Sequence, residues 1–282
     1  MLFRSHPKGV KVFYYISPKI WAWKESRIKH IKASVDKMFL IFPFEIDFYK
    51  KHQYQAEYVG NPLLDEISAF HSRYISCEQF KIENGLNDKP IIALVPGSRK
   101  QEIVQILPVM LQVQKYFSEY QFVVAGAPSI DDDIYKKVIR AFNIPIVRDK
   151  TYELLNYSTA ALVTSGTATL EAGLFNVPQV VCYKFKGGSL VYKLGRWIFL
   201  KVPYVSLVNI ILGKEAVKEL LQQYLTPENL KLELYKILNN EPCRRQMLDD
   251  YFKMREIMGE KGASARAAQK MYNVLKQVNK NE

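Results

Sequence analysis

Cysteine and histidine are scarce in this chain, and several familiar ligand-binding motifs are missing. The three cysteines stand far apart and form no C-x-x-C pair, which favours a reduced compartment over a disulfide framework. The four histidines show no H-E-x-x-H or similar spacing, so a zinc site has no support. The motifs G-x-x-x-x-G-K-[ST] and G-x-G-x-x-G are both absent, so neither a P-loop nor a dinucleotide fingerprint is present. We therefore expect neither a metal nor a cofactor.

Long apolar runs are missing as well. No stretch reaches the roughly 18 uninterrupted apolar residues of a membrane-spanning helix, and no apolar segment of a signal peptide is visible. The nearest run, residues 190–212, is interrupted by Lys193, Arg196, Lys201 and Pro203. Its first part, Leu190 to Leu200, predicts an amphipathic helix at a membrane surface or a subunit interface, or a core helix with lysine stems along apolar surface.

The length and the charge set further bounds. A chain of 282 residues has room for about two domains. Its net charge of +12 favours an acidic partner, which could be nucleic acid, anionic lipid or a phosphorylated substrate. The basic and aromatic stretch from Trp21 to Lys32 matches no nucleic-acid reader fold, so we expect no nucleic-acid partner.

Strands and helices alternate along the sequence, which predicts two α/β domains with parallel sheets. In the first series we expect strands at 10–16, 38–42 and 56–59, and helices at 19–36 and 43–52. The second series begins with an apolar strand at 90–95, followed by strands at 121–125, 144–147, 160–164, 179–183 and 204–211. We expect the other helices at 64–86, 102–116, 131–142, 151–157, 168–175, 214–223, 227–238, 242–258 and 264–280.

Two turns that follow buried strands carry the residues best suited to a ligand. Pro96-Gly97-Ser98-Arg99 follows the strand at 90–95, and Ser165-Gly166-Thr167 follows the strand at 160–164 and opens a helix. Ligands of open parallel sheets bind at the carboxyl ends of the strands, and the N–H groups and dipole at a helix start favour an anion. Gly97 permits close backbone approach, and Arg99 offers a forked donor for phosphate.

Glu171 lies about one turn inside the second helix, where its carboxylate could accept hydrogen bonds from sugar hydroxyls. The alternative is an ordinary strand–helix junction in which Ser165 caps the helix and Glu171 is solvated. Pro96–Arg99 could likewise be a plain surface turn. The pairing of the two turns favours a nucleotide-sugar site.

Six sequence blocks, in order, resemble the lipid-A-disaccharide synthase family of GT-B glycosyltransferases. A looser pattern of serine, glycine, threonine and glutamate also resembles other GT-B nucleotide-sugar transferases. The blocks are S-P-K-I-W-A-W-K (17–24), L-I-F-P-F-E-I-D-F-Y (40–49), Y-V-G-N-P-L-L-D (58–65), L-V-P-G-S-R-K-Q-E-I (94–103), T-S-G-T-A-T-L-E-A (164–172) and P-Y-V-S-L-V-N-I-I-L-G (203–213).

The resemblance implies a GT-B fold with two Rossmann-like domains, the N-terminal one incomplete. Residues 1–67 would belong to the acceptor-side domain and 68–250 to the UDP-sugar-binding domain, while the helices of 251–282 would pack back toward the former. It also implies an inverting transferase of a Gram-negative bacterium, cytoplasmic and peripheral to the anionic inner membrane. The donor would be UDP-2,3-diacylglucosamine and the acceptor 2,3-diacylglucosamine 1-phosphate (lipid X), giving lipid A disaccharide 1-phosphate and UDP.

On the donor side, the resemblance implies that Arg99 and the helix start stabilise the departing UDP and that Glu171 holds the ribose. Where the family usually reads S-L-P-N, this chain has Val208 in the proline position, before Asn209. The predicted substrate-binding residues are Gly97, Ser98, Arg99, Ser165, Gly166, Thr167, Glu171, Tyr183, Lys184 and Asn209.

The acceptor hydroxyl needs a general base, and the resemblance places it in a G-x-D-x-P-D-F-type segment upstream of the strand at 10–16. This sequence has no such segment, and Met1-Leu2-Phe3-Arg4-Ser5 leads into no element. We therefore expect an N-terminally truncated reading frame, with donor binding but without full turnover.

Two other functions remain open at this point. One is another UDP-GlcNAc-using GT-B enzyme, such as a peptidoglycan transferase or an epimerase, against which the W-A-W and Y-V-S-L blocks argue. The other is a non-catalytic nucleotide- or lipid-binding protein. Acyl-chain length, the membrane-facing surface and the oligomeric state, a homodimer included, do not follow from the sequence.

Overall fold

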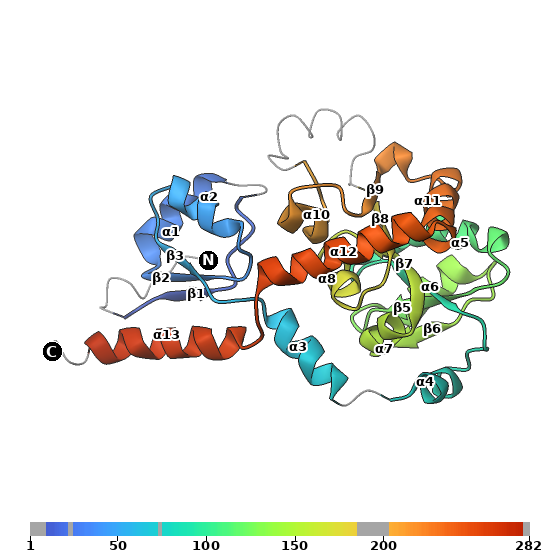
Figure 1. Cartoon of the computed structure of the whole chain (residues 1–282), viewed down its shortest axis with the longest axis horizontal. Coiled ribbons are helices and arrows are strands. Elements are labelled where there is room, and N and C mark those ends of the chain that lie inside the picture. The colour runs from blue at the N-terminus through green and yellow to red at the C-terminus, as the bar shows by residue number, and fades with distance from the viewer. Residues whose placement is uncertain (1–9, 22–24, 73–74, 185–202, 279–282) are drawn as a thin grey trace. The chain divides into compact units, whose positions relative to one another are not determined.

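The computed structural model describes residues 10–21, 25–72, 75–184 and 203–278, which form two compact units (Figure 1). Of these residues, the first unit contains those up to Ala69 and those from Arg255 onward, and the second contains Phe70 to Lys184 and Pro203 to Met254. The opening residues Met1–Ser5, the predicted helix at 190–200 and part of the W-A-W block lie outside the described residues. Among the described helices, none has the length and apolar character needed to cross a membrane.

The first unit is built on a three-stranded parallel sheet in the order β1-β2-β3. Met38 and Leu40 of β2 pack against α1 and α2 on one face, while Phe39 between them packs against Ala267 of α13 on the other. This alternation is the period of two that a strand imposes on its side chains. The elements are β1 (Phe13–Tyr15), β2 (Lys37–Leu40), β3 (Ala56–Tyr58), η2 (Glu25–Arg27), α1 (Ile28–Ser34), α2 (Glu45–Lys51) and α13 (Ala263–Val278).

The second unit is built on a six-stranded sheet in the order β6-β5-β4-β7-β8-β9, in which every pair is parallel. Its central strand β4 is I-I-A-L-V and buried throughout, as expected for a strand covered by helices on both faces. The strands are β4 (Ile91–Val95), β5 (Gln121–Gly126), β6 (Ile146–Arg148), β7 (Ser158–Thr164), β8 (Gln179–Tyr183) and β9 (Lys218–Leu221).

Helices connect the strands of the second unit, and two further helices carry the chain between the two units. Within the second unit the order of strands and helices is the doubly wound α/β arrangement (Figure 1). The helical elements are α3 (Pro62–His71), α4 (Cys77–Glu83), α5 (Lys100–Gln112), η3 (Gln114–Tyr116), α6 (Asp132–Ile139), α7 (Thr151–Asn156), α8 (Thr167–Leu174), α10 (Leu207–Leu212), η4 (Gln222–Tyr224), α11 (Pro227–Asn239) and α12 (Glu241–Met258).

Two predicted elements near the end of the second unit were wrong. Residues 204–211, expected as a strand and loop, contain helix α10, which Ser206 caps by accepting from the Asn209 N–H at 3.2 Å. Residues 214–223, expected as a helix, contain strand β9. The sequence K-E-L-L suits a helix, but pairing with β8 satisfies the backbone groups along that strand's open edge, so tertiary context overrides local propensity.

Two other predicted helices were wrong in extent. In the described part of the helix expected over 19–36, residues 19–21 form a turn in which the Ile20 N–H bonds to the Pro18 carbonyl at 2.6 Å, and the residues from Glu25 to Ser34 form η2 and α1. The single helix expected over 64–86 is two helices, α3 and α4. Ser76 caps α4 by accepting from the Gln79 N–H at 3.1 Å, which starts a new helix within the predicted one.

Candidate functional site

The turn between β7 and α8 has a backbone conformation that only glycine adopts readily. Gly166 has φ 134° and ψ −152° and precedes the first residue of α8, Thr167. A Cβ built on Gly166 meets no atom of the described residues within 4 Å, so none of these fills the space beside the helix start. Thr167 is exposed at this point. The turn thus offers backbone N–H groups at a helix N-terminus, the arrangement that binds anions.

Ser165 does not cap this helix, so the plain-junction alternative fails in that respect. Its hydroxyl donates to the Val205 carbonyl at 2.8 Å, while Gly166 occupies the cap position without a side-chain bond. The Thr169 hydroxyl donates to the Gly166 carbonyl at 2.8 Å and closes the first turn of α8. Ser165 therefore ties the turn to the segment before α10.

The turn after β4 lies on the neighbouring strand, because Val95 pairs with Val163 of β7. Gly97 has φ +99°, and a Cβ there would collide with the Glu102 carboxylate, so this position needs glycine. Arg99 occupies the N-cap position of α5, but its side chain makes no capping hydrogen bond. Its Nη1 lies 2.8 Å from Glu102 Oε1. The Arg99 side chain is 80% exposed and thus accessible to a ligand.

Tyr183 ends β8 and shares its surroundings with the turn after β4. Burial raises the pKa of the Tyr183 phenol, the negative charge of Glu102 raises it further, and the positive charge of Arg99 lowers it. The three side chains are therefore close enough to interact electrostatically, although β7 separates their strands. Lys184, the next residue, is partly exposed at the same edge of the sheet.

Glu171 lies four residues after Thr167, so both occupy the same side of α8. It is partly exposed. Ser98 is exposed, and its carbonyl accepts a hydrogen bond from the Ser129 hydroxyl at 3.5 Å. The structure thus places Gly97, Ser98, Arg99, Ser165, Gly166, Thr167, Tyr183 and Lys184 at the carboxyl edge of one sheet, with Glu171 on the helix that begins there.

Asn209 differs from the other predicted site residues, because its side chain is fully buried and fully hydrogen-bonded within the protein. Its Nδ2 donates to the Val217 carbonyl and to Glu219 Oε1, both at 2.9 Å. Its Oδ1 accepts from the N–H groups of Ala216 and Val217 at 2.8 and 2.9 Å. An amide with all these bonds made supports the loop around it and has nothing left for a substrate.

Sequence analysis missed three residues of this region: Glu102, Glu219 and Gln222. Both glutamates lay within predicted helices, Glu219 in the one at 214–223 and Glu102 at the start of the one at 102–116, and neither was singled out. Gln222 follows the last residue of β9 with φ 52°, and its buried Nε2 bonds to no group in the part of the chain that the structure describes. A left-handed backbone and an unsatisfied amide at a ligand edge are features of functional sites. The described residues contain no group of three or more His, Cys, Asp or Glu placed to hold a metal.

The fold and the edge with its two turns define a class, the GT-B-like α/β proteins. Solved structures share this fold at low identity. UDP-GlcNAc 2-epimerase from Neisseria meningitidis bound to UDP-GlcNAc superposes with a TM-score of 0.66 at 13% identity, covering 95% of this chain and 71% of that one. The S. aureus MnaA structure with UDP superposes with a TM-score of 0.65 at 14% identity, covering 96% and 70%. At such identity the likeness concerns the fold alone.

Sequence relatives narrow the class to one family. The family model described as Lipid-A-disaccharide synthetase matches residues 3–272. Lipid-A-disaccharide synthase from Myxococcus xanthus (strain DK1622) is 40% identical over 274 residues, which are 95% of this chain and 70% of the relative. The same enzyme from Coxiella burnetii (strain Dugway 5J108-111) is 34% identical over 271 residues, again 95% and 70%. The chain belongs to the lipid-A-disaccharide synthase family, the glycosyltransferases of lipid A biosynthesis.

The resemblance stated from the six sequence blocks is therefore confirmed, as is the α/β GT-B fold with parallel sheets. The epimerase alternative is supported by the shared fold of the two solved structures. It is not supported by sequence similarity, since those structures are only 13–14% identical to this chain.

Proposed function

We propose that this chain binds UDP-2,3-diacylglucosamine at the carboxyl edge of its six-stranded sheet, for transfer of the sugar to 2,3-diacylglucosamine 1-phosphate. The observation that supports this most is the pairing of two turns on the adjacent strands β4 and β7. One presents the exposed guanidinium of Arg99, and the other presents Gly166 and the start of α8. Two phosphates of a nucleoside diphosphate match a forked cation beside a helix N-terminus.

The chemistry assigned to these groups follows from where charge develops. Direct displacement at the anomeric carbon breaks the bond to UDP, so negative charge grows on its pyrophosphate. Arg99 and the N–H groups at Thr167 stabilise that charge as it forms. Gly97 and Ser98 bring backbone close to the phosphates, because a glycine permits close approach.

The remaining site residues hold the rest of the donor. Glu171, one turn along α8, accepts hydrogen bonds from the ribose hydroxyls. Tyr183 and Lys184 line the same edge from β8. Ser165 and Asn209 act by holding the backbone around the donor site, because their side chains already bond within the protein.

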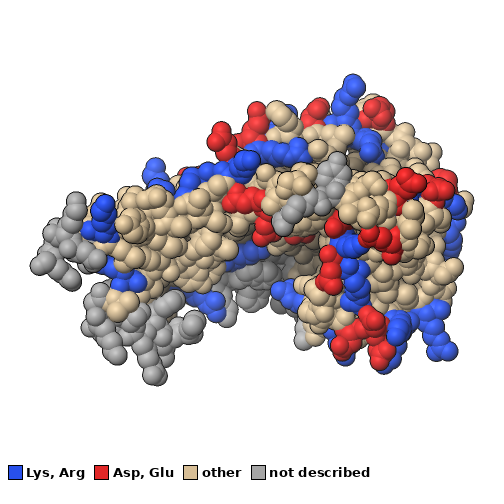
Figure 2. Space-filling model, turned by 90° about the horizontal axis from the view of Figure 1, so that it is seen from below, with Lys and Arg blue, Asp and Glu red and all other residues tan. Residues whose placement is uncertain are grey.

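We also place the protein at the cytoplasmic face of the inner membrane, as a peripheral enzyme. Both substrates carry acyl chains and phosphate, and the net charge of +12 favours an anionic surface. On the face drawn in Figure 2, basic side chains lie interspersed with acidic ones.

Calorimetric titration with UDP tests the donor site in the 282-residue protein, and transferase activity is measured beside it. We expect UDP binding that weakens in Arg99→Ala and Glu171→Ala. Absence of UDP binding by the folded protein would contradict the site. If the Arg99→Ala and Glu171→Ala variants kept their activity in a complementation assay, a non-catalytic role of the protein would be favoured.

A further inference from the structure

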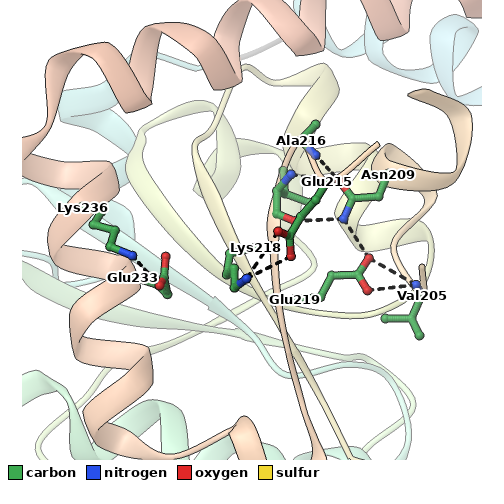
Figure 3. Close-up of polar contacts among 9 residues, drawn as sticks. Val205, Asn209, Glu215, Ala216, Lys218, Glu219, Glu233 and Lys236 are labelled. Atoms are coloured by element: carbon green, nitrogen blue, oxygen red, sulfur yellow. Dashed lines mark hydrogen bonds and ion pairs between the residues drawn. The ribbon is translucent and has the colours of Figure 1, made fainter. Parts of the chain in front are cut away.

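Glu219 on β9 accepts from three hydrogen-bond donors in the segment that precedes and begins α10. Figure 3 shows the bonds from Val205 and Asn209. Its Oε2 accepts from the Val205 N–H at 3.0 Å, and its Oε1 accepts from the same N–H at 3.2 Å and from the Ser206 N–H at 2.9 Å. Asn209 Nδ2 adds a bond of 2.9 Å to Oε1. The carboxylate therefore fixes both ends of the short segment from Val205 to Asn209.

The charge of Glu219 is compensated by these N–H groups. Among the described residues, neither lysine nor arginine forms an ion pair with it, in contrast to Glu215 on the loop before β9, which pairs with Lys218 at 3.1 Å (Figure 3). A carboxylate that accepts backbone N–H bonds makes stronger bonds than a neutral acceptor would. Because its partners include backbone N–H groups, Glu219 holds the backbone of this segment in place.

The segment that Glu219 holds is bonded in turn to the start of α8. The Val205 carbonyl accepts from the Ser165 hydroxyl at 2.8 Å, and the Leu207 N–H donates to the Thr169 hydroxyl at 3.2 Å. The Thr169 hydroxyl also bonds to the Gly166 carbonyl at 2.8 Å. Two routes of hydrogen bonds thus run from Glu219 to the glycine turn, one on each side of Gly166.

We propose that Glu219 is a positioning residue for the donor diphosphate, acting through the Val205–Ser206 backbone on the turn Ser165–Thr169. Gly166 has no Cβ to restrict its backbone, and φ 134° with ψ −152° is only one of the conformations open to a glycine, so the turn keeps this shape only when its surroundings hold it. Glu219 supplies that restraint from β9, the edge strand of the same sheet. The inference rests on the proposed donor site, and goes beyond it by assigning a role to a residue that is not among the proposed donor-binding residues.

Glu219→Gln tests this, because glutamine has nearly the same size but loses the charge and one acceptor. We expect a folded protein whose UDP dissociation constant rises about tenfold, the scale of one lost charge-assisted bond. Ser165→Ala removes the link to the turn alone and should weaken UDP binding by a similar factor. The double variant should bind no worse than Glu219→Gln alone, because the route through Ser165 is already lost when Glu219 no longer holds Val205. Glu215→Gln is the matched control and should bind UDP as the unchanged protein does.

Amide hydrogen exchange gives a readout that needs no ligand. In Glu219→Gln, exchange should become faster at residues 166–170 and stay unchanged at the start of α5. Unchanged exchange at 166–170 in the folded variant would overturn the positioning role, as would additive losses in the double variant. Failure of the unchanged protein to bind UDP would instead overturn the donor site, and exchange would still decide the role of Glu219.

Discussion

Arg99 and Glu102 face each other across the first turn of α5, with Nη1 of the arginine 2.8 Å from Oε1 of the glutamate. The two side chains differ in exposure, 80% for Arg99 and 14% for Glu102. The carboxylate also fills the space where a side chain on Gly97 would stand. One glutamate therefore shapes the turn and holds the arginine that we expect to meet the phosphates.

Replacing Arg99 should weaken donor binding. Arg99→Ala removes the forked donor, and we expect UDP affinity to fall by about 2 kcal/mol, the scale of hydrogen bonds to a charged group. Arg99→Lys should recover only part of this, because an ammonium cannot bond two phosphate oxygens in the same fork. Calorimetric titration with UDP measures both. Arg140→Ala is the control, since Arg140 is exposed at the end of α6, near the opposite edge of the sheet, and equal losses in both variants would contradict a local contact.

Neutralising Glu102 should have the opposite effect. In Glu102→Gln the guanidinium loses its ion-pair partner and the approaching diphosphate meets one negative charge fewer. We expect UDP affinity to rise by about 0.5 to 1 kcal/mol, the usual scale of a partly exposed ion pair. The gain should shrink at high salt, because screening weakens the repulsion that the substitution removes. Weaker binding by the folded variant would mean that the charge of Glu102 organises the turn more than it opposes the phosphates.

A methyl group at Gly166 should strain the turn without colliding with its neighbours. The residue adopts φ 134° and ψ −152°, and no atom lies within 4 Å of the point where a Cβ would stand. We expect Gly166→Ala to lower the free energy of unfolding by about 2 to 3 kcal/mol, the range for a non-glycine residue in this region. Gly213→Ala, in equally open space at φ 66°, should cost about 1 kcal/mol. Urea unfolding of both variants checks the order, and a larger loss for Gly213→Ala would refute it.

Glu45 in the first unit should make stability depend on pH. The carboxyl is 1% exposed and accepts from the Ser17 hydroxyl at 2.8 Å, the Trp21 indole at 3.1 Å and the Phe42 N–H at 3.2 Å. Burial raises its pKa, and these hydrogen bonds lower it by less. The folded protein thus holds this proton more tightly than the unfolded chain does.

The sign follows from that difference. The stabilisation by Glu45 is complete below the unfolded pKa of about 4.3 and is lost as the pH rises through the raised folded pKa. Urea unfolding from about pH 4 to about pH 8 should therefore show the unchanged protein losing stability relative to Glu45→Gln as the pH rises.

Glu57→Gln is the matched control of opposite sign. Its hydrogen bond to Lys270 at 2.7 Å lowers the pKa of Glu57, so its contribution is present above the unfolded pKa and lost as the pH falls through the folded one. The effect should be small, because Glu57 is 33% exposed and the pair is screened by solvent. Parallel pH profiles for the two variants would contradict the assignment of Glu45.

Local sequence was enough to predict much of the second unit. The apolar run of β4 and the glycines of the turns after β4 and β7 encode their own structure, because burial on both faces and a positive φ each select few residue types. Family-specific blocks added the donor chemistry. The same local logic failed at α10 and β9, where K-E-L-L reads as helical and the open edge of β8 decides otherwise.

By itself, the sequence determined the parallel α/β plan, the two glycine turns and the family, because each of these is encoded in neighbouring residues. Only the tertiary structure decided what Ser165, Asn209 and Glu219 do. Their partners lie 7 to 40 residues away along the chain, and neither propensity nor spacing specifies which hydroxyl, amide or carboxylate meets which backbone group. Folding brings β7, β9 and the start of α10 together, and that proximity makes Ser165, considered as a helix cap, and Glu219, expected within a helix, the supports of the glycine turn.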